Sequence, residues 1–110
     1  MKTKYIKLEN TKPLEAQLAG AAAVLASGGL VAFPTETVYG LGADATDAEA
    51  AKRIYAAKGR PSDNPLIVHI AVPSDADRYA VTGELYRRLA KSFMPGPLTV
   101  ILPKRDCIPF

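Results

Sequence analysis

The chain has 110 residues, 48% of them hydrophobic, and a formal net charge of +3. This length accommodates one domain with a buried core, and the mild basic charge is compatible with an anionic ligand or RNA. A single cysteine, Cys107, excludes an internal disulfide, one histidine leaves too few ligands for a Cys/His zinc site, and no apolar run approaches the roughly 20 residues that span a bilayer.

Together these features favour a cytoplasmic protein with no membrane association. Basic residues stand near the start of the chain, but no apolar segment follows them, so we expect no signal peptide.

The first part of the chain predicts a strand, a helix and a second strand. Tyr5–Leu8 alternates weakly and is expected to be a short edge strand. Thr11 is a suitable N-cap for a helix whose apolar residues recur at 3.6-residue spacing until Gly28 and Gly29 end it. The continuous apolar run Leu30–Phe33 predicts a strand covered on both faces.

A second strand and a second helix are expected next. Pro34–Gly42 alternates between polar and apolar residues and ends in glycines, as a strand would. Thr46 and Glu49 have the spacing of a capping box, which opens a helix that continues to Lys58. The apolar face of this helix is expected to contain Ala50, Ile54 and Ala57.

The second half of the chain continues the alternation of helices and strands. Leu66–Ala71 and Leu98–Leu102 are apolar runs that predict strands, and Ser74–Tyr79 predicts a short helical turn. Thr82 is expected to cap a helix that ends before the turn Met94–Pro97. The apolar face of that helix would contain Leu85, Leu89 and Phe93. The pattern predicts an α+β (α/β-like) fold, a twisted mixed sheet with helices packed on it.

The loop Lys58–Pro65 carries the strongest functional signal. Its proline and glycine residues keep it out of regular structure, between a predicted helix and a predicted strand, where binding groups often lie. Lys58 and Arg60 offer a compact cation and a planar fork of donors, which suits an anionic, phosphorylated ligand. The alternative is an ordinary charged turn exposed to solvent.

Two further polar features stand near this loop in the predicted fold. Thr35, Thr37 and Tyr39 would share one face of a strand and could bind a small polar ligand, unless they serve ordinary cross-strand packing. His69 could bind a ligand carboxylate or act as an acid or base, but a lone histidine in an apolar strand is often a core residue.

The remaining basic residues are expected mostly on helix faces, with solvated surface as the first interpretation and RNA contact as the second. They are Lys52, Arg53, Arg87, Arg88 and Lys91. Neither a Walker A loop nor a Gly-x-Gly-x-x-Gly segment occurs, so a nucleotide would need an unusual site.

Three stretches of the chain resemble a known family. Ser27–Gly42, Lys58–Ile70 and Met94–Thr99 resemble, in order and spacing, the three motifs of the YrdC-like domain of the threonylcarbamoyl-AMP synthase family. The resemblance extends to about Lys104 and covers nearly the whole chain. It implies a YrdC-like fold.

The resemblance also implies an activity and a set of site residues. Enzymes of this family convert L-threonine, bicarbonate and ATP to threonylcarbamoyl-AMP and pyrophosphate, for the synthesis of threonylcarbamoyladenosine in tRNA. Mg²⁺ is expected on the ATP. By position, the threonine-binding residues would be Thr35, Thr37 and His69, and the ATP-binding residues would be Lys58, Arg60, Ser62 and Asn64. Lys58 and Arg60 would be catalytic, because they would face the phosphates.

The chain departs from the family pattern in its length. The family domain continues with an arginine and a Ser-Ala-Asn segment that complete both substrate sites, so residues 1–110 are expected to be a partial YrdC-like domain. Either the chain is truncated or a partner supplies the rest. We expect at most weak activity from the isolated chain, and possible self-association through an exposed half-core.

Two alternatives to the synthase assignment stay open. The first is a tRNA-binding module without catalysis, which a mildly basic half-domain could be. The second is the hydrogenase maturation carbamoyltransferase, which contains a similar domain. It would need large flanking domains with zinc-finger cysteines, and this sequence has neither.

Overall fold

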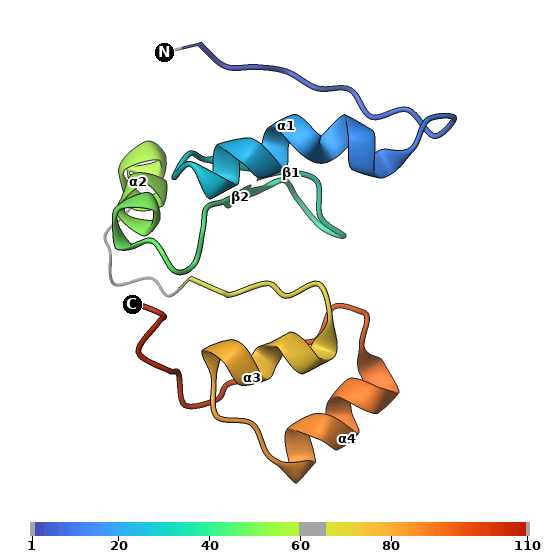
Figure 1. Cartoon of the computed structure of the whole chain (residues 1–110), viewed down its shortest axis with the longest axis vertical. Coiled ribbons are helices and arrows are strands. Elements are labelled where there is room, and N and C mark those ends of the chain that lie inside the picture. Colours follow the sequence, from blue (N-terminus) through green and yellow to red (C-terminus); the bar gives the residue numbers. More distant parts are fainter. Residues whose placement is uncertain (1, 60–65, 110) are drawn as a thin grey trace.

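The computed structural model describes residues 2–59 and 66–109, and it confirms the α+β class (Figure 1). Its elements, in chain order, are α1 (Leu14–Ala26), β1 (Val31–Phe33), β2 (Gly40–Gly42), α2 (Ala48–Lys58), the 3₁₀ helix η1 (Pro73–Asp75), α3 (Ala76–Tyr79) and α4 (Glu84–Phe93). Among the described residues, no helix is long and apolar enough to cross a membrane.

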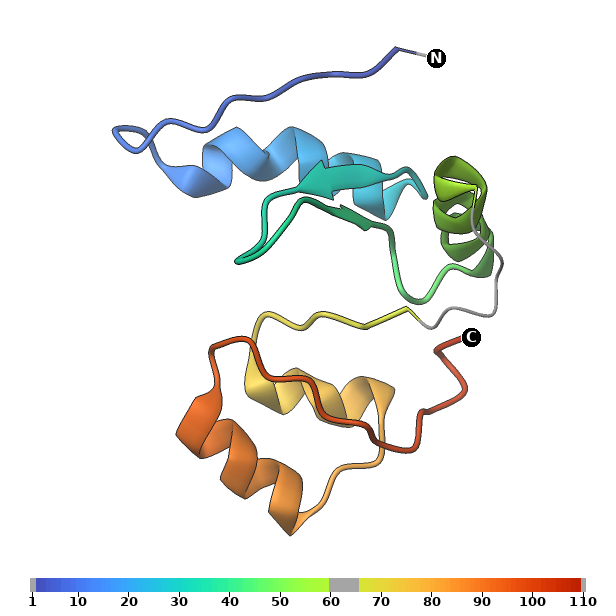
Figure 2. The same ribbon diagram turned by 180° about the vertical axis from the view of Figure 1, so that it is seen from behind.

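The elements form two groups, which Figures 1 and 2 show from opposite sides. In the first, α1 contacts β1 along the β1–β2 hairpin, and α2 lies at one end of the hairpin. The second group contains α3, α4 and the C-terminal segment, which runs back along α3 (Figure 2). Residues 66–71 pass between the two groups (Figure 1).

The sheet is an antiparallel pair in which Val31 lies opposite Gly42 and Phe33 lies opposite Gly40. The expected strand over Pro34–Gly42 is therefore wrong for its first part, because residues 34–39 form the turn that reverses the chain. Two antiparallel strands need such a reversal between them, and the sequence alternation alone did not reveal it.

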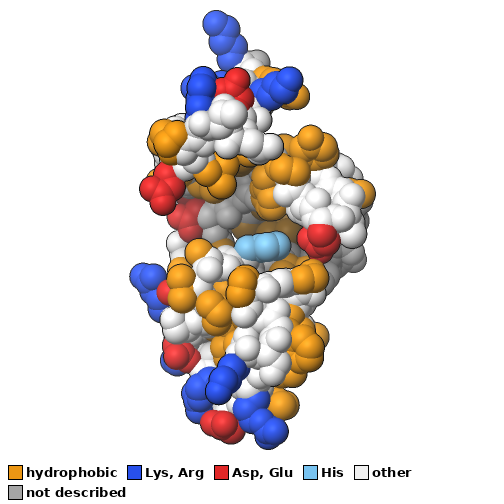
Figure 3. Space-filling view, turned by 90° about the vertical axis from the view of Figure 1, so that its right-hand side faces the viewer, with side chains coloured by type: hydrophobic (Ala, Val, Ile, Leu, Met, Phe, Trp, Pro, Cys, Tyr) orange, Lys and Arg blue, Asp and Glu red, His pale blue; other side chains and the backbone are white. Residues whose placement is uncertain are grey.

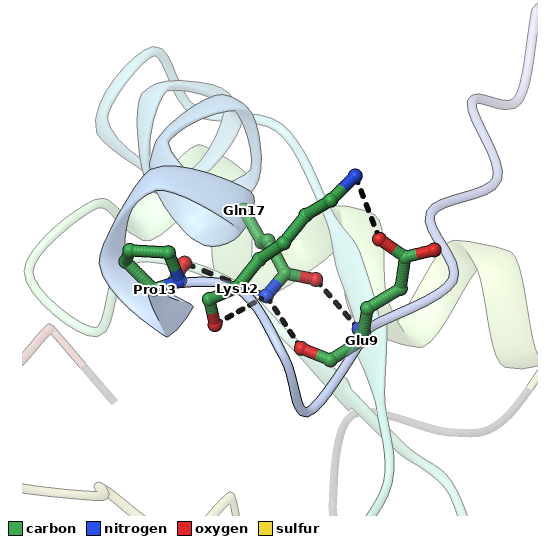
Figure 4. Close-up of polar contacts among 4 residues, drawn as sticks. All are labelled: Glu9, Lys12, Pro13 and Gln17. Carbon is green, nitrogen blue, oxygen red and sulfur yellow. Dashed lines mark hydrogen bonds and ion pairs between the residues drawn. The ribbon is translucent and has the colours of Figure 1, made fainter.

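Helix α1 begins differently from the prediction, and its N-terminus is shown in Figure 4. Thr11 does not cap it. Instead, the Gln17 amide accepts a hydrogen bond from the Glu9 N–H at 2.7 Å and donates to the Glu9 carbonyl at 2.9 Å and to the Lys12 carbonyl at 3.1 Å. The predicted end is confirmed: Gly28 has φ +90°, a value that favours glycine.

Helix α2 is held at both ends. The Asp47 carboxylate, rather than the predicted Thr46, accepts from the Glu49 N–H at 3.0 Å, and the helix ends at Gly59 with φ +64°. Thr46 instead donates to Asp44. The predicted inner face is correct except for Ala57, which is exposed; the buried residues are Ala50, Ala51 and Ile54.

A small core joins α3 to α4. Its buried members are Ala76, Tyr86 and Ala90, with Ile70, Met94, Val100 and Leu102 packed partly against them. The Tyr86 hydroxyl donates to the Pro73 carbonyl at 2.7 Å, which satisfies the one polar atom that this side chain brings into the core.

The predicted apolar face of α4 is wrong for Leu85 and Phe93, which are exposed. Leu89 is half-buried, and the buried residues of the helix are Tyr86 and Ala90. The predicted cap is wrong too. Gly83 holds the N-cap position, and the Thr82 hydroxyl donates to the Asp77 carboxylate instead.

Three predicted strands do not form: Tyr5–Leu8, Leu66–Ala71 and Leu98–Leu102. Their backbones pair with no neighbouring strand among the described residues, and a strand exists only as part of a hydrogen-bonded ladder. The nearest approach to a further ladder is a single bridge between Ala80 and Lys104.

Candidate functional site

A cavity of about 630 Å³ lies between the β1–β2 hairpin, α2 and the segment that begins at Leu66. Its wall includes Thr35 from the hairpin turn, Lys58 from the last position of α2, and His69 from the extended segment. Three of the residues that the sequence singled out, far apart along the chain, thus face one hollow. Figure 3 shows a hollow on the side of the molecule, with the histidine side chain at its surface.

The turn between β1 and β2 organises the two threonines. The Thr35 hydroxyl donates to the Val38 carbonyl and accepts from the Thr37 N–H at 3.3 Å. The two threonine Oγ1 atoms are 3.5 Å apart. A turn, rather than the predicted alternation along a strand, brings these hydroxyls together, and Thr37 is not among the residues that line the cavity. Tyr39 is 77% exposed and does not line it either.

Lys58 is the cation that the structure places at the cavity. Its ammonium is exposed at the C-terminal end of α2, where the helix dipole favours positive charge. Within residues 2–59 and 66–109, no carboxylate forms an ion pair with it. The other predicted ATP ligands lie outside the described residues: Arg60, Ser62 and Asn64.

His69 lines this cavity and is not a core residue, because its side chain is exposed. Its Nδ1 lies 3.2 Å from the Ile67 carbonyl oxygen. A carbonyl oxygen can only accept, so this contact requires the proton on Nδ1 and leaves Nε2 of the neutral ring as an acceptor. The alternative of a satisfied histidine inside the core is therefore wrong.

Asp44 also lines the cavity, and the sequence reasoning missed it. Its carboxylate accepts from the Thr46 hydroxyl at 2.7 Å and from the Thr46 N–H at 2.9 Å. These hydrogen bonds, the hydroxyl first, lower the pKa of Asp44 and outweigh the opposing effect of partial burial. The Asp-x-Thr sequence of residues 44–46 is the local signal that could have revealed this turn.

The arrangement suits a small, polar, anionic ligand. Its lining includes an ammonium, a hydroxyl and an exposed imidazole whose Nε2 is an acceptor in the neutral ring. A volume of about 630 Å³ lies within the range typical of small-molecule sites.

Comparison with known proteins identifies the family to which the chain belongs. The family model described as "Telomere recombination", named Sua5/YciO/YrdC, matches residues 23–109. The threonylcarbamoyl-AMP synthase of Pyrococcus abyssi is 57% identical over 90 residues, which is 81% of this chain and 26% of that protein. The synthase of Bacillus subtilis is 54% identical over 107 residues, which is 94% of this chain and 31% of that protein.

A solved structure is similar as well. The crystal structure of P. abyssi Sua5 complexed with L-threonine superposes with a TM-score of 0.83 at 52% identity, over 89% of this chain and 29% of that one. The chain thus spans between a quarter and a third of the length of these relatives. A family model that covers most of the sequence, together with this likeness in sequence and structure, shows that the chain belongs to the Sua5/YciO/YrdC family, that of the threonylcarbamoyl-AMP synthases.

Proposed function

We propose that this chain contributes the threonine-facing and phosphate-facing walls of a threonylcarbamoyl-AMP synthase site. The observation that carries the proposal is the shared cavity of Thr35, Lys58 and His69. The P. abyssi relative, whose structure holds L-threonine, supports threonine as the amino acid substrate. The proposed reaction uses L-threonine, bicarbonate and ATP and feeds threonylcarbamoyladenosine synthesis in tRNA.

In this proposal each side chain has a defined part. His69 offers its Nε2 to a polar group of threonine, and the linked hydroxyls of Thr35 and Thr37 offer further hydrogen bonds. Lys58 faces the phosphates of ATP, together with Arg60, Ser62 and Asn64 from the neighbouring loop. An ammonium with no described carboxylate partner is available for such a ligand.

The proposed reaction needs the carbamate placed in line with the α-phosphorus and the charge on the leaving pyrophosphate stabilised. The carbamate oxygen of N-carboxythreonine attacks the α-phosphorus of ATP, the bond from that phosphorus to the bridging oxygen breaks, and pyrophosphate leaves with the electron pair. Negative charge therefore grows on the leaving group, where Lys58 and Arg60 would stabilise it. The hydroxyls and the imidazole would hold the carbamate in line.

We propose that Mg²⁺ enters as part of the ATP substrate. Among the residues that the structure describes, no three acidic, histidine or cysteine side chains come together as a metal site. Mg²⁺ commonly binds through substrate phosphates with one or two protein carboxylates, and Asp44 is a carboxylate of the cavity wall.

Substitution of the cavity cation tests this proposal. We expect Lys58→Ala to weaken MgATP binding about 10- to 100-fold, because the substitution removes a hydrogen bond between charged groups. Isothermal titration calorimetry measures it. Lys52→Ala is the matched control, because Lys52 also lies on α2 but pairs with Glu49 at 3.2 Å. Equal affinities of the two variants would contradict the phosphate-facing role of Lys58.

Turnover is a separate measurement. A pyrophosphate-release assay with L-threonine, bicarbonate and ATP is expected to show at most weak activity for residues 1–110 alone. Robust turnover would show that these residues already contain the complete site.

A tRNA-binding module is the alternative function. Several of the basic side chains considered for it have protein partners: Lys52 pairs with Glu49, Arg87 lies 3.7 Å from Glu84, and Arg53 donates to the Gly28 carbonyl. Salt-dependent tRNA binding that survives Lys58→Ala, while ATP binding is lost, would separate an RNA surface from the nucleotide site.

A further inference from the structure

We propose that Phe33, held in place by Gly40 and Gly42, is a positioning residue that orients the imidazole of His69 towards the cavity. The inference rests on the proposed function for its consequence in threonine binding. The orientation itself can be tested without any ligand.

The hairpin glycines lie close against the Phe33 ring. A Cβ atom on Gly42 would lie 2.8 Å from Cε1 of Phe33, closer than real Cβ contacts come. A Cβ on Gly40 would lie 3.2 Å from Cζ of the same ring. Neither glycine has a positive φ, so the absence of a side chain is used here for close approach to the ring and not for an unusual backbone.

The Phe33 ring in turn contacts the His69 ring. Their ring centroids are 6.3 Å apart and their planes meet at 79°, an edge-to-face arrangement. Both side chains line the same cavity. His69 is exposed and Phe33 is half-buried, so, among the described residues, the two contacts that bear on the rotation of the imidazole are this aromatic edge and the Ile67 carbonyl.

The Ile67 carbonyl determines which ring nitrogen of His69 is free for a ligand. The Ile67 carbonyl holds the proton on Nδ1, at 3.2 Å, only while the ring keeps its present rotation. Movement of Phe33 would release that rotation, lengthen the Nδ1 contact and allow the other tautomer. The hairpin glycines, Phe33 and the Ile67 carbonyl therefore act together on one imidazole.

Nuclear magnetic resonance tests this chain of contacts, because His69 is the one histidine of the sequence and its ring signals are unambiguous. The ring ¹⁵N shifts report the tautomer of the free protein. We expect Gly42→Ala to shift them from the Nδ1–H form towards a mixture, and to weaken L-threonine binding about tenfold, as for the loss of one hydrogen bond.

Gly83→Ala is the matched control, because a Cβ there meets nothing within 4 Å and the backbone φ is −151°. It should leave both measurements unchanged. Gly40→Ala is a milder variant that carries the test if Gly42→Ala does not fold. The double variant Gly42→Ala with Phe33→Leu is decisive: in the Phe33→Leu background, Gly42→Ala should have no further effect on the His69 ¹⁵N shifts.

The inference is overturned if the His69 ¹⁵N shifts of Gly42→Ala equal those of Gly83→Ala. It is equally overturned if the effect of Gly42→Ala persists in full without Phe33. Failure of the unsubstituted chain to bind L-threonine would instead contradict the proposed function and leave the ¹⁵N result to decide the positioning role.

Discussion

Among single side chains, the carboxylate of Asp44 is the group whose ionisation the fold changes most clearly. Two hydrogen bonds from Thr46 favour the charged form and lower the pKa of Asp44. Because the folded-state pKa lies below that of the unfolded chain, the resulting stability is complete above the ordinary pKa of an aspartate. It is lost as the pH falls through the folded-state value.

We expect Thr46→Val to raise the pKa of Asp44 towards its ordinary value, because the substitution removes the hydroxyl that lowers it most. Titration of the Asp44 carboxyl carbon by nuclear magnetic resonance measures the change. The variant should also lose less stability on acidification than the unsubstituted chain. Thr11→Val, at an exposed position, serves as control, and an unchanged Asp44 titration in Thr46→Val would show that the hydroxyl contact is absent in solution.

At the scale of the elements, α2 connects the core to the cavity. Asp47 caps its first turn, Ile54 is buried along its inner face, and Lys58 lies at its end beside Gly59. The residues that stabilise this helix therefore also determine where the Lys58 ammonium stands.

Asp47→Ala is expected to lower the free energy of unfolding by about 1 kcal/mol, the usual cost of removing an N-cap carboxylate. Urea unfolding followed by circular dichroism measures it. Asp106→Ala removes an exposed carboxylate outside any helix and should change the stability little. If both variants unfold at the same urea concentration, Asp47 does not act as a cap.

At the scale of the whole molecule, the described fold is open. The radius of gyration is 15.3 Å, whereas a compact domain of this length has one of about 13 Å. A second hollow of about 1010 Å³ is lined by residues 66–71 and 94–102. Residues 66–70 and 98–102 are apolar segments without strand partners among the described residues. Large side chains on these segments are exposed, and Ile101 is 94% exposed.

Such a surface predicts self-association, because unpaired extended backbone and exposed apolar side chains both favour contact with another chain. We expect size-exclusion chromatography with light scattering to show a mass that rises with protein concentration. Ile101→Asp should reduce this rise, whereas Thr3→Asp, which adds the same charge to the N-terminal segment, should not. A mass of one chain at every concentration would contradict the prediction.

The order and approximate bounds of the helices follow from the sequence, since glycines end α1 and α2 and apolar periodicity marks their lengths. Local signals of this kind depend on neighbouring residues and need no distant partner. The caps were less predictable. The N-cap positions belong to Pro13, Asp47 and Gly83, each one or two residues after the threonine that the pattern favoured.

The family, the α+β class and the residue types at the site can therefore be predicted from the amino-acid sequence. Which apolar runs form strands follows only from the packing of the chain, because a ladder depends on a distant partner that no local pattern reveals. Packing also brings Thr35, Lys58 and His69 to one cavity, which the exposed Tyr39 does not line. Proximity between residues that are distant in sequence is a property of the packed chain, whereas the sequence gives only the residue types and their order.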